Sequence, residues 1–138
     1  MNDFLKKRIT LKNINDKLKQ KTLSLPFKNI LWDDDQQSQF IESLVMNIPI
    51  PLFCVYENKD VVWQVVDGFQ RINAINNFIN GELKLVDIEF MNDIKGLTFS
   101  QLPKNLKKRI LKTEFQFVII NPSAPKSFKD IIYRRFNC

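Results

Sequence analysis

The spacing of apolar residues along the chain predicts a mixture of helices and strands. Two regions carry apolar residues at the spacing of one helix face. These residues are Phe40, Ile41, Leu44 and Val45 in the first region and Phe128, Ile131, Ile132 and Phe136 in the second. The acidic run Asp33 to Asp35 offers an N-cap to the first helix. The segment Ile48-Pro49-Ile50-Pro51 ends that helix, because proline removes a backbone donor.

Several short segments have the composition of strands, since they alternate or are rich in β-branched and aromatic residues. They are Thr22 to Pro26, Leu52 to Tyr56, Val61 to Val66, Leu83 to Val86 and Glu114 to Ile120. The polar segment from Glu57 to Asp60 is typical of a turn, so the strands on either side of it are expected to form a hairpin.

The strand over residues 61–66 leads directly into a further helix. Asp67-Gly68 ends the strand, and Asn80-Gly81 supplies a C-cap to the helix. The apolar face of this helix consists of Ile72, Ile75, Phe78 and Ile79. Ser100 is expected to cap a later helix that carries Leu102, Leu106 and Ile110. Together these elements predict an α+β fold in which helices flank a small mixed sheet.

Residues 1–21 differ from the rest of the chain, because they are rich in lysine and only sparsely apolar. We expect them to form a loosely attached basic arm, partly helical, ahead of a domain over residues 22–138. The chain carries 21 Lys and Arg against 15 Asp and Glu, a formal net charge of +6. This charge permits contact with nucleic acid. A solvated basic face with no partner remains the alternative for the arm.

Length and composition exclude several classes of protein. With 138 residues, the chain fits one domain, and it contains no histidine. Ser/His/Asp triads and His-ligated metal sites are therefore excluded, and we expect no metal site. No apolar run approaches the roughly 20 residues of a membrane span, and no secretory signal is visible. We therefore expect a cytoplasmic protein, in which Cys54 is a small core residue.

The turn from Asp67 to Arg71 gathers groups that suit an anion. The first N–H groups of a helix are unpaired and attract negative charge, and Gly68 lets a ligand approach the backbone. Gln70 can orient water or a phosphate oxygen, and Arg71 can grip phosphate with its planar fork. A purely structural interpretation remains open, in which Asp67 is only an N-cap and Arg71 only a surface cation.

The residues around this turn resemble a known family, DUF262. The resemblance rests on four segments in the family's order and spacing, over roughly residues 22 to 137. They are Ile41-Glu42-Ser43-Leu44, Asn47-Ile48-Pro49-Ile50-Pro51, Val65-Val66-Asp67-Gly68-Phe69-Gln70-Arg71-Ile72 and Phe78-Ile79-Asn80-Gly81-Glu82-Leu83-Lys84-Leu85. The third contains the family's Asp-Gly-x-Gln-Arg motif, with Ile72 in place of the usual leucine.

The resemblance implies both a fold and a function. The family is similar to the ParB N-terminal domain and to sulfiredoxin, and it includes the N-terminal half of GmrSD-type enzymes that restrict modified DNA. There the domain is associated with binding and hydrolysis of a nucleoside triphosphate. By this resemblance, Asp67, Gln70 and Arg71 are the catalytic residues, and Gly68 and Phe69 contact the nucleotide. Magnesium can accompany the nucleotide, and GTP, ATP and CTP are not distinguished.

The chain departs from the family pattern in two places. Lys28 stands where the family carries a Gln-Arg pair, so it keeps a charge but lacks the bidentate fork. Tyr133 to Asn137 is similar to the family's Phe-x-Arg-Leu-Asn segment, which adds Arg135 and Asn137 to the expected phosphate site. Family members continue beyond this segment, whereas this chain stops at Cys138. The domain is therefore expected to be either a natural short form or an incomplete one.

Two functions follow as hypotheses. The first is a nucleotide-binding regulatory domain, with NTP hydrolysis as its reaction, in DNA restriction or anti-phage defence. The second is a ParB-like module that binds DNA or another protein without turnover. Without histidine, this chain alone is not expected to cleave DNA, so a nuclease-bearing partner chain or a homo-oligomer is expected. A folded but inactive remnant is the third alternative.

Overall fold

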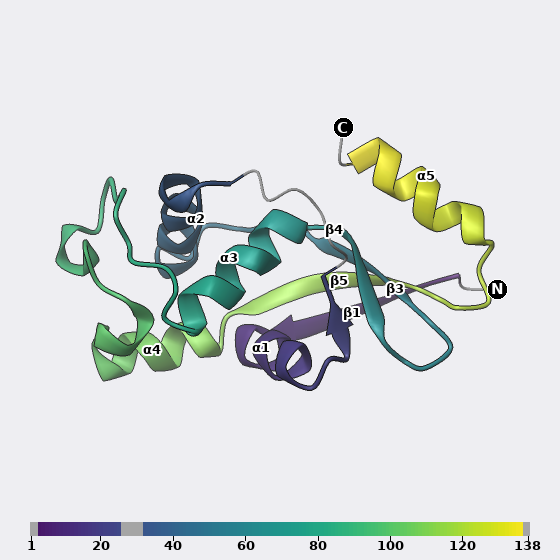
Figure 1. Cartoon of the computed structure of the whole chain (residues 1–138), viewed down its shortest axis with the longest axis horizontal. Coiled ribbons are helices and arrows are strands. Elements are labelled where there is room, and N and C mark those ends of the chain that lie inside the picture. Colours follow the sequence, from purple (N-terminus) through teal and green to yellow (C-terminus); the bar gives the residue numbers. More distant parts are fainter. Residues whose placement is uncertain (1–2, 26–31, 137–138) are drawn as a thin grey trace.

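A five-stranded mixed sheet with the strand order β1-β5-β3-β4-β2 organises the chain (Figure 1). The structure is a computed structural model that describes residues 3–25 and 32–136. Its strands are β1 (Phe4–Thr10), β2 (Leu23–Ser24), β3 (Phe53–Glu57), β4 (Trp63–Asp67) and β5 (Glu114–Ile120). β1 pairs antiparallel with β5 and β3 antiparallel with β4, while β5 with β3 and β2 with β4 are parallel pairs.

Five α-helices and two short 3₁₀ helices accompany the sheet in the described residues. They are α1 (Leu11–Lys19), α2 (Asp34–Val45), α3 (Phe69–Ile79), η1 (Asn92–Ile94), η2 (Phe99–Gln101), α4 (Lys104–Leu111) and α5 (Lys126–Phe136). The fold is therefore α+β with a mixed sheet flanked by helices, as expected. None of the described helices is long and apolar enough to cross a membrane.

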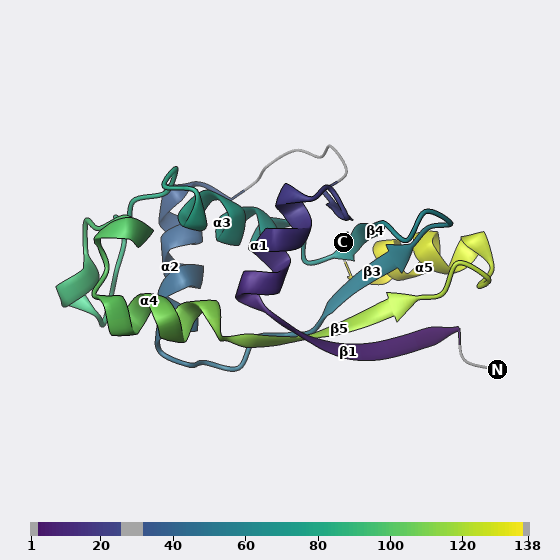
Figure 2. The ribbon, with the colours of Figure 1, turned by 90° about the horizontal axis from the view of Figure 1, so that it is seen from below.

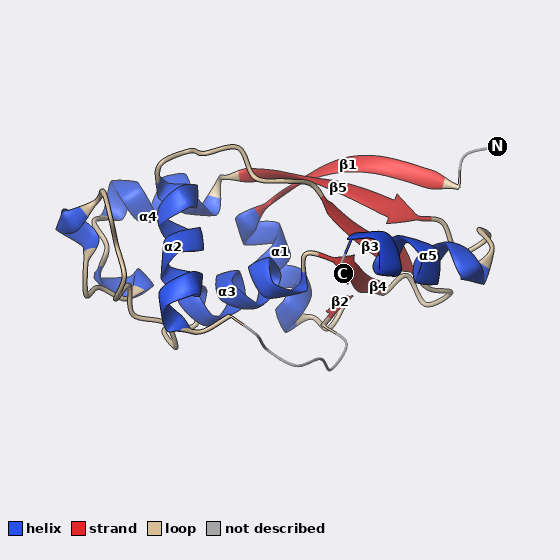
Figure 3. Cartoon of the chain, turned by 90° about the horizontal axis from the view of Figure 1, so that it is seen from above, coloured by secondary structure: helices blue, strands red, loops and turns tan. Residues whose placement is uncertain are grey.

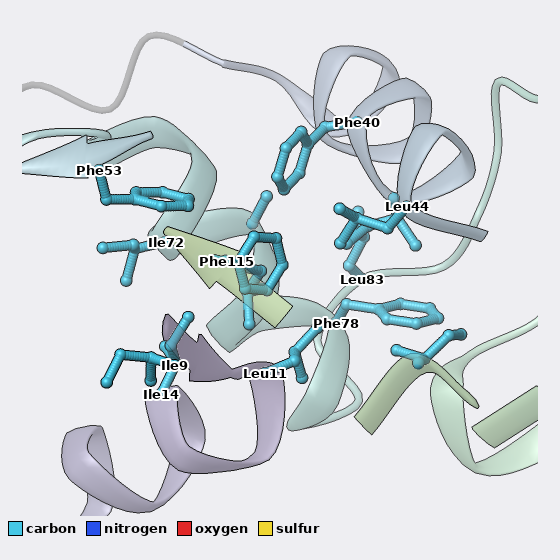
Figure 4. Packing of buried hydrophobic residues seen from close by; sticks show 14 of the residues in the cluster. Ile9, Leu11, Ile14, Phe40, Leu44, Phe53, Ile72, Phe78, Leu83 and Phe115 are labelled. Carbon is cyan, nitrogen blue, oxygen red and sulfur yellow. The ribbon is translucent and has the colours of Figure 1, made fainter. Parts of the chain in front are cut away.

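The alternation of side chains along the strands divides the core into two parts. Phe53 and Phe117 point into the larger part, where their rings stack with centroids 5.0 Å apart, and both are fully buried. This part lies between the sheet and α1 to α4 (Figures 2 and 4). Cys54 and Ile120 point to the opposite face, which α5 covers with Phe128 and Ile132. Cys54 is thus a small core residue, as predicted.

The local signals around α2 and the hairpin are confirmed. Asp33 caps α2 in a capping box, in which its carboxylate accepts the Gln36 N–H while the Gln36 side chain accepts the Asp33 N–H. α2 ends at Val45, ahead of the proline-rich segment, and β3 and β4 form the expected hairpin. These elements carry the chain to the turn that follows Asp67.

The N-terminal residues are part of the fold, so the expectation of a loosely attached arm was wrong. β1 forms an edge of the sheet, and Thr10 caps α1 by accepting the Asn13 N–H. Leu11 and Ile14 are fully buried in the larger core. The sparse apolar residues therefore anchor the segment, while Lys6, Lys7, Lys12 and Lys19 are exposed.

Two other predicted boundaries differ from the structure. Residues 83–86 are not a strand, although Leu83 and Leu85 alternate inward; the Ser38 side chain of α2 bonds the backbone of Lys84 and Val86, and the backbone of Leu85 bonds that of Gly96 and Leu97. Ser100 lies within η2, and α4 begins at Lys104 after Pro103. Pro103 takes the N-cap position of α4, where no side chain caps the helix, so the cap expected from Ser100 was wrong.

Candidate functional site

The turn between β4 and α3 is built on a glycine that no other residue can replace without strain. Gly68 has φ +108°, a left-handed conformation that residues with a side chain rarely adopt. A Cβ atom at this position would lie 2.2 Å from Cδ1 of Phe53. The sequence predicted a turn here, and the structure shows that packing against Phe53 also requires glycine.

Asp67 is the last residue of β4 and does not cap α3, so the N-cap expected for it was wrong. The N-cap position is occupied by Gly68, and no side chain caps the helix there. The Asp67 carboxylate instead lies 3.8 Å from the guanidinium of Arg71. Burial raises the pKa of the Asp67 carboxyl, while Arg71 and the Gly68 N–H act in the opposite direction.

Arg71 connects this turn to the proline-rich segment that precedes β3. Its Nη1 donates to the carbonyl of Pro51, and its Nη2 donates to the carbonyl of Leu52 over 3.2 Å. The guanidinium also lies 4.1 Å from the centre of the Phe53 ring. The side chain is only 14% exposed, so it is a buried connector and not a surface cation. Two of the four segments on which the family resemblance rests are thus in direct contact.

We expect Arg71→Lys to lower the free energy of unfolding by about 1 to 2 kcal/mol, since lysine cannot bond both carbonyls with a planar fork. Urea denaturation followed by tryptophan fluorescence measures this loss. Arg109→Lys on the exposed side of α4 is the matched control and should change stability little. Equal stability of the two variants would contradict the connecting role of Arg71.

Gln70 connects the start of α3 to the entry of α2. Its Oε1 accepts the Trp32 N–H over 3.2 Å, and the Trp32 carbonyl accepts from Gln37 over 3.1 Å. Gln70 therefore fixes the chain that leads into α2. Its position in the first turn of α3 also leaves it next to any ligand at that helix end.

A small cavity of about 220 Å³ lies between the sheet and α5 beside this turn. Its lining is mainly apolar and includes Leu52, Cys54, Asp67, Val118 and Ile132. The Asp67 carboxylate and the C-terminal half of α5 therefore share one cavity, and Figure 3 shows α5 lying across β3 and β4. Burial, with the nearby charge of Asp67, raises the pKa of the Cys54 thiol to about 12, so this thiol stays protonated.

The structure brings together only part of the predicted phosphate site. Asp67, Gly68 and Arg71 meet at the turn, and Phe69 is half-buried beside them. Arg135 lies on the exposed surface of α5, and no contact among the described residues joins it to the turn. Lys28 and Asn137 lie outside the described residues. The carbonyls of Pro51 and Leu52 were not foreseen, because main-chain acceptors leave no mark in the sequence.

Among the described residues, no group of three or more Asp, Glu or Cys gathers as a metal site.

A family model described as GmrSD restriction endonuclease, N-terminal domain, matches residues 11–137. No curated protein and no solved structure matches the chain. The match confirms the resemblance seen in the sequence, and it begins within the segment assigned to the basic arm. The chain therefore belongs to the family of GmrSD restriction endonuclease N-terminal domains.

Proposed function

We propose that this domain binds a nucleoside triphosphate at the turn between β4 and α3, and that binding regulates DNA restriction. The observation that carries the proposal is the start of α3, which has no side-chain cap. The first helical bond runs from the Ile72 N–H to the Gly68 carbonyl. The N–H groups ahead of Ile72 thus point out of the helix, where the macrodipole favours phosphate. Gly68 gives this turn its left-handed backbone, with φ +108°.

The neighbouring side chains give this site its chemistry. Arg71 and Asp67 lie at the turn, and Lys28, Arg135 and Asn137 complete the phosphate contacts in the proposal. Asp67 or Gln70 positions the attacking water if hydrolysis occurs. Magnesium would accompany the phosphates, and the half-buried Asp67 carboxylate at the turn would be an oxygen ligand for it.

Family membership supports a role in restriction or anti-phage defence, in the cytoplasm where DNA lies. DNA cleavage then comes from a nuclease carried by a partner chain or by a homo-oligomeric assembly. The small mixed sheet flanked by helices also supports kinship with the ParB and sulfiredoxin folds.

A second function is favoured by the contacts of Arg71. Its guanidinium already donates to two carbonyls and stacks on Phe53. Few of its N–H groups therefore remain to stabilise the negative charge of a transition state. With a net charge of +6, this arrangement supports a ParB-like module that binds DNA or a partner protein without turnover.

Binding of fluorescent GTP, ATP and CTP analogues, with and without magnesium, tests the first function. We expect Arg71→Ala to weaken binding by about tenfold or more, because it removes the cation beside the turn. Arg109→Ala removes an equal charge from the exposed side of α4 and should leave binding unchanged. Thermal melting of each variant identifies conditions in which both are folded, and phosphate release in the same samples separates turnover from binding.

The outcomes distinguish the two functions. Saturable binding of one nucleotide that Arg71→Ala removes supports the nucleotide site. Retention of duplex DNA with no binding of any of the nucleotides rejects it in favour of the second function. A folded protein that binds neither ligand indicates an inactive domain.

A further inference from the structure

β1 forms one end of the sheet, and no strand among residues 3–25 and 32–136 lies on its outer side (Figures 2 and 3). A strand in this position presents unpaired backbone groups, which can accept another strand. Most of β1 is exposed, and Leu5 remains 61% exposed. This edge is longer than the opposite one, where β2 consists of only Leu23 and Ser24.

The hydrogen bonds at both ends of the β1–β5 ladder identify which backbone groups face outward. The Asn121 N–H donates to the Asp3 carbonyl, and the Leu11 N–H donates to the Thr113 carbonyl, both over 2.8 Å. In an antiparallel pair, bonded residues alternate with unbonded ones. Odd-numbered residues of β1 therefore bond β5, and the N–H and carbonyl groups of Phe4, Lys6 and Arg8 point away from it.

The side chains along this edge are basic at three consecutive positions, and Glu114 of β5 lies near Arg8 at one end of them. Lys6, Lys7 and Arg8 are consecutive and exposed, and none of them forms an ion pair or side-chain hydrogen bond with another described residue. Their cross-strand partners on β5 are Val118, Phe117 and Gln116, which carry no charge. Phe4, on the same face as Lys6 and Arg8, stacks on Phe128 with ring centroids 5.7 Å apart. The edge is thus anchored at one end and basic along its length.

We infer that the outer edge of β1 binds an extended acidic segment of a partner protein as an additional strand. Main-chain hydrogen bonds to Phe4, Lys6 and Arg8 supply affinity in this mode, and alternating side chains supply specificity. Acidic residues on one face of the incoming strand lie beside Lys6 and Arg8. An apolar residue on its other face lies beside Leu5.

The positive charge of this edge favours an acidic segment over a second copy of this chain as the added strand. An antiparallel pair of β1 strands centred on Lys6 would place the two Lys6 side chains opposite each other. Like charges in opposed positions destabilise such a pair. The same lysines and arginine that oppose self-pairing attract an acidic strand and speed its association.

A short fluorescent peptide that alternates glutamate with valine is the probe for this edge. We expect the whole chain to bind it, measured by fluorescence anisotropy, and Lys6→Pro to weaken binding by about tenfold or more. Proline at this position removes an outward N–H and leaves the bonds to β5 intact, and proline is tolerated at such edge positions. Lys7→Pro, by contrast, removes an N–H of the β5 ladder and should lower the melting temperature.

Charge variants test the same edge without altering its backbone. Lys6→Glu should weaken peptide binding by about tenfold. Lys104→Glu, an equal charge change at the exposed start of α4, should leave binding within about twofold. If Lys6→Pro does not fold, the double variant Lys6→Glu/Arg8→Glu replaces it.

Three outcomes would overturn the inference. One is a wild-type protein that does not bind the peptide, or a folded Lys6→Pro variant that binds it equally well. Another is preference for oligothymidine over the peptide, which would make the edge a nucleic-acid contact. The third is self-association of the wild type that Lys6→Pro abolishes, which would make the occupant a second copy.

Discussion

Replacing Gly68 with alanine is expected to lower the free energy of unfolding by about 3 to 5 kcal/mol, from backbone strain and overpacking together. The left-handed φ of +108° accounts for the strain. The added methyl would lie 2.2 Å and 2.8 Å from two ring carbons of Phe53. That ring cannot move aside easily, because it is fully buried, stacks on Phe117 and meets the edge of Phe115.

Gly81→Ala is the matched control for this prediction. Gly81 also has a positive φ, +80°, but nothing lies within 4 Å of the position its Cβ would take. Its substitution should therefore cost about 1 kcal/mol through backbone strain alone. Urea denaturation followed by tryptophan fluorescence compares the two variants. Equal losses would show that contact with Phe53 contributes nothing at Gly68.

A double variant isolates the steric part of the effect. Phe53→Leu removes the ring carbons that the new methyl would meet, although it destabilises the core by itself. In the Gly68→Ala background, this second substitution should cost less than it does in the wild type, because it relieves the overlap. A coupling free energy of about 1 kcal/mol or more between the two positions is expected. If the losses of the two single variants simply add in the double variant, the whole loss in Gly68→Ala comes from backbone strain.

The sequence predicted those parts of the fold whose causes are local. The helical spacing before Val45, the β3–β4 hairpin and the strand that runs into Gly68 depend on side-chain periodicity and turn chemistry, and all are present. The placement of Asp67, Gly68 and Arg71 around one turn follows from the same local order. The contact of Arg71 with Pro51 and Leu52 does not, because it joins distant segments through backbone carbonyls.

Two of the wrong predictions arise from how apolar residues are buried. Inward alternation of apolar residues looks like a strand even where no strand pairs, and sparse apolar residues can still anchor a segment. Leu83 and Leu85 alternate inward, as in a strand, yet the Ser38 hydroxyl bonds the backbone on both sides of Leu85. The backbone of Leu85 bonds Gly96 and Leu97 of a nearby loop, so the segment is held without becoming part of a sheet. In residues 4–19, a few apolar positions such as Ile9 and Leu11 are enough to fix a strand and a helix among lysines.

The second large effect is expected at Glu42, a residue whose role the sequence did not reveal. Its side chain is buried, and its carboxylate accepts the backbone N–H groups of Glu89, Phe90 and Met91 over 3.1, 2.7 and 2.8 Å. Alanine would leave these donors without their acceptor. We expect Glu42→Ala to lower the free energy of unfolding by about 3 kcal/mol or more, given the cost of unsatisfied buried donors. Glu82→Ala, on the exposed side of the chain, is the matched control.

The pH dependence of stability separates the charge of Glu42 from its packing. Burial raises the pKa of its carboxyl, but the three backbone N–H bonds outweigh burial, so the pKa lies below its ordinary value of 4.5. The unfolded chain therefore takes up this proton at a higher pH than the folded chain does. The stabilisation by Glu42 is complete above the unfolded pKa and is lost as the pH falls through the folded pKa. Glu42→Gln cannot titrate, so its stability deficit relative to the wild type should be greatest near pH 7 and shrink below about pH 4.5. A deficit that stays constant from neutral to acid pH in urea denaturation would assign the role of Glu42 to packing alone.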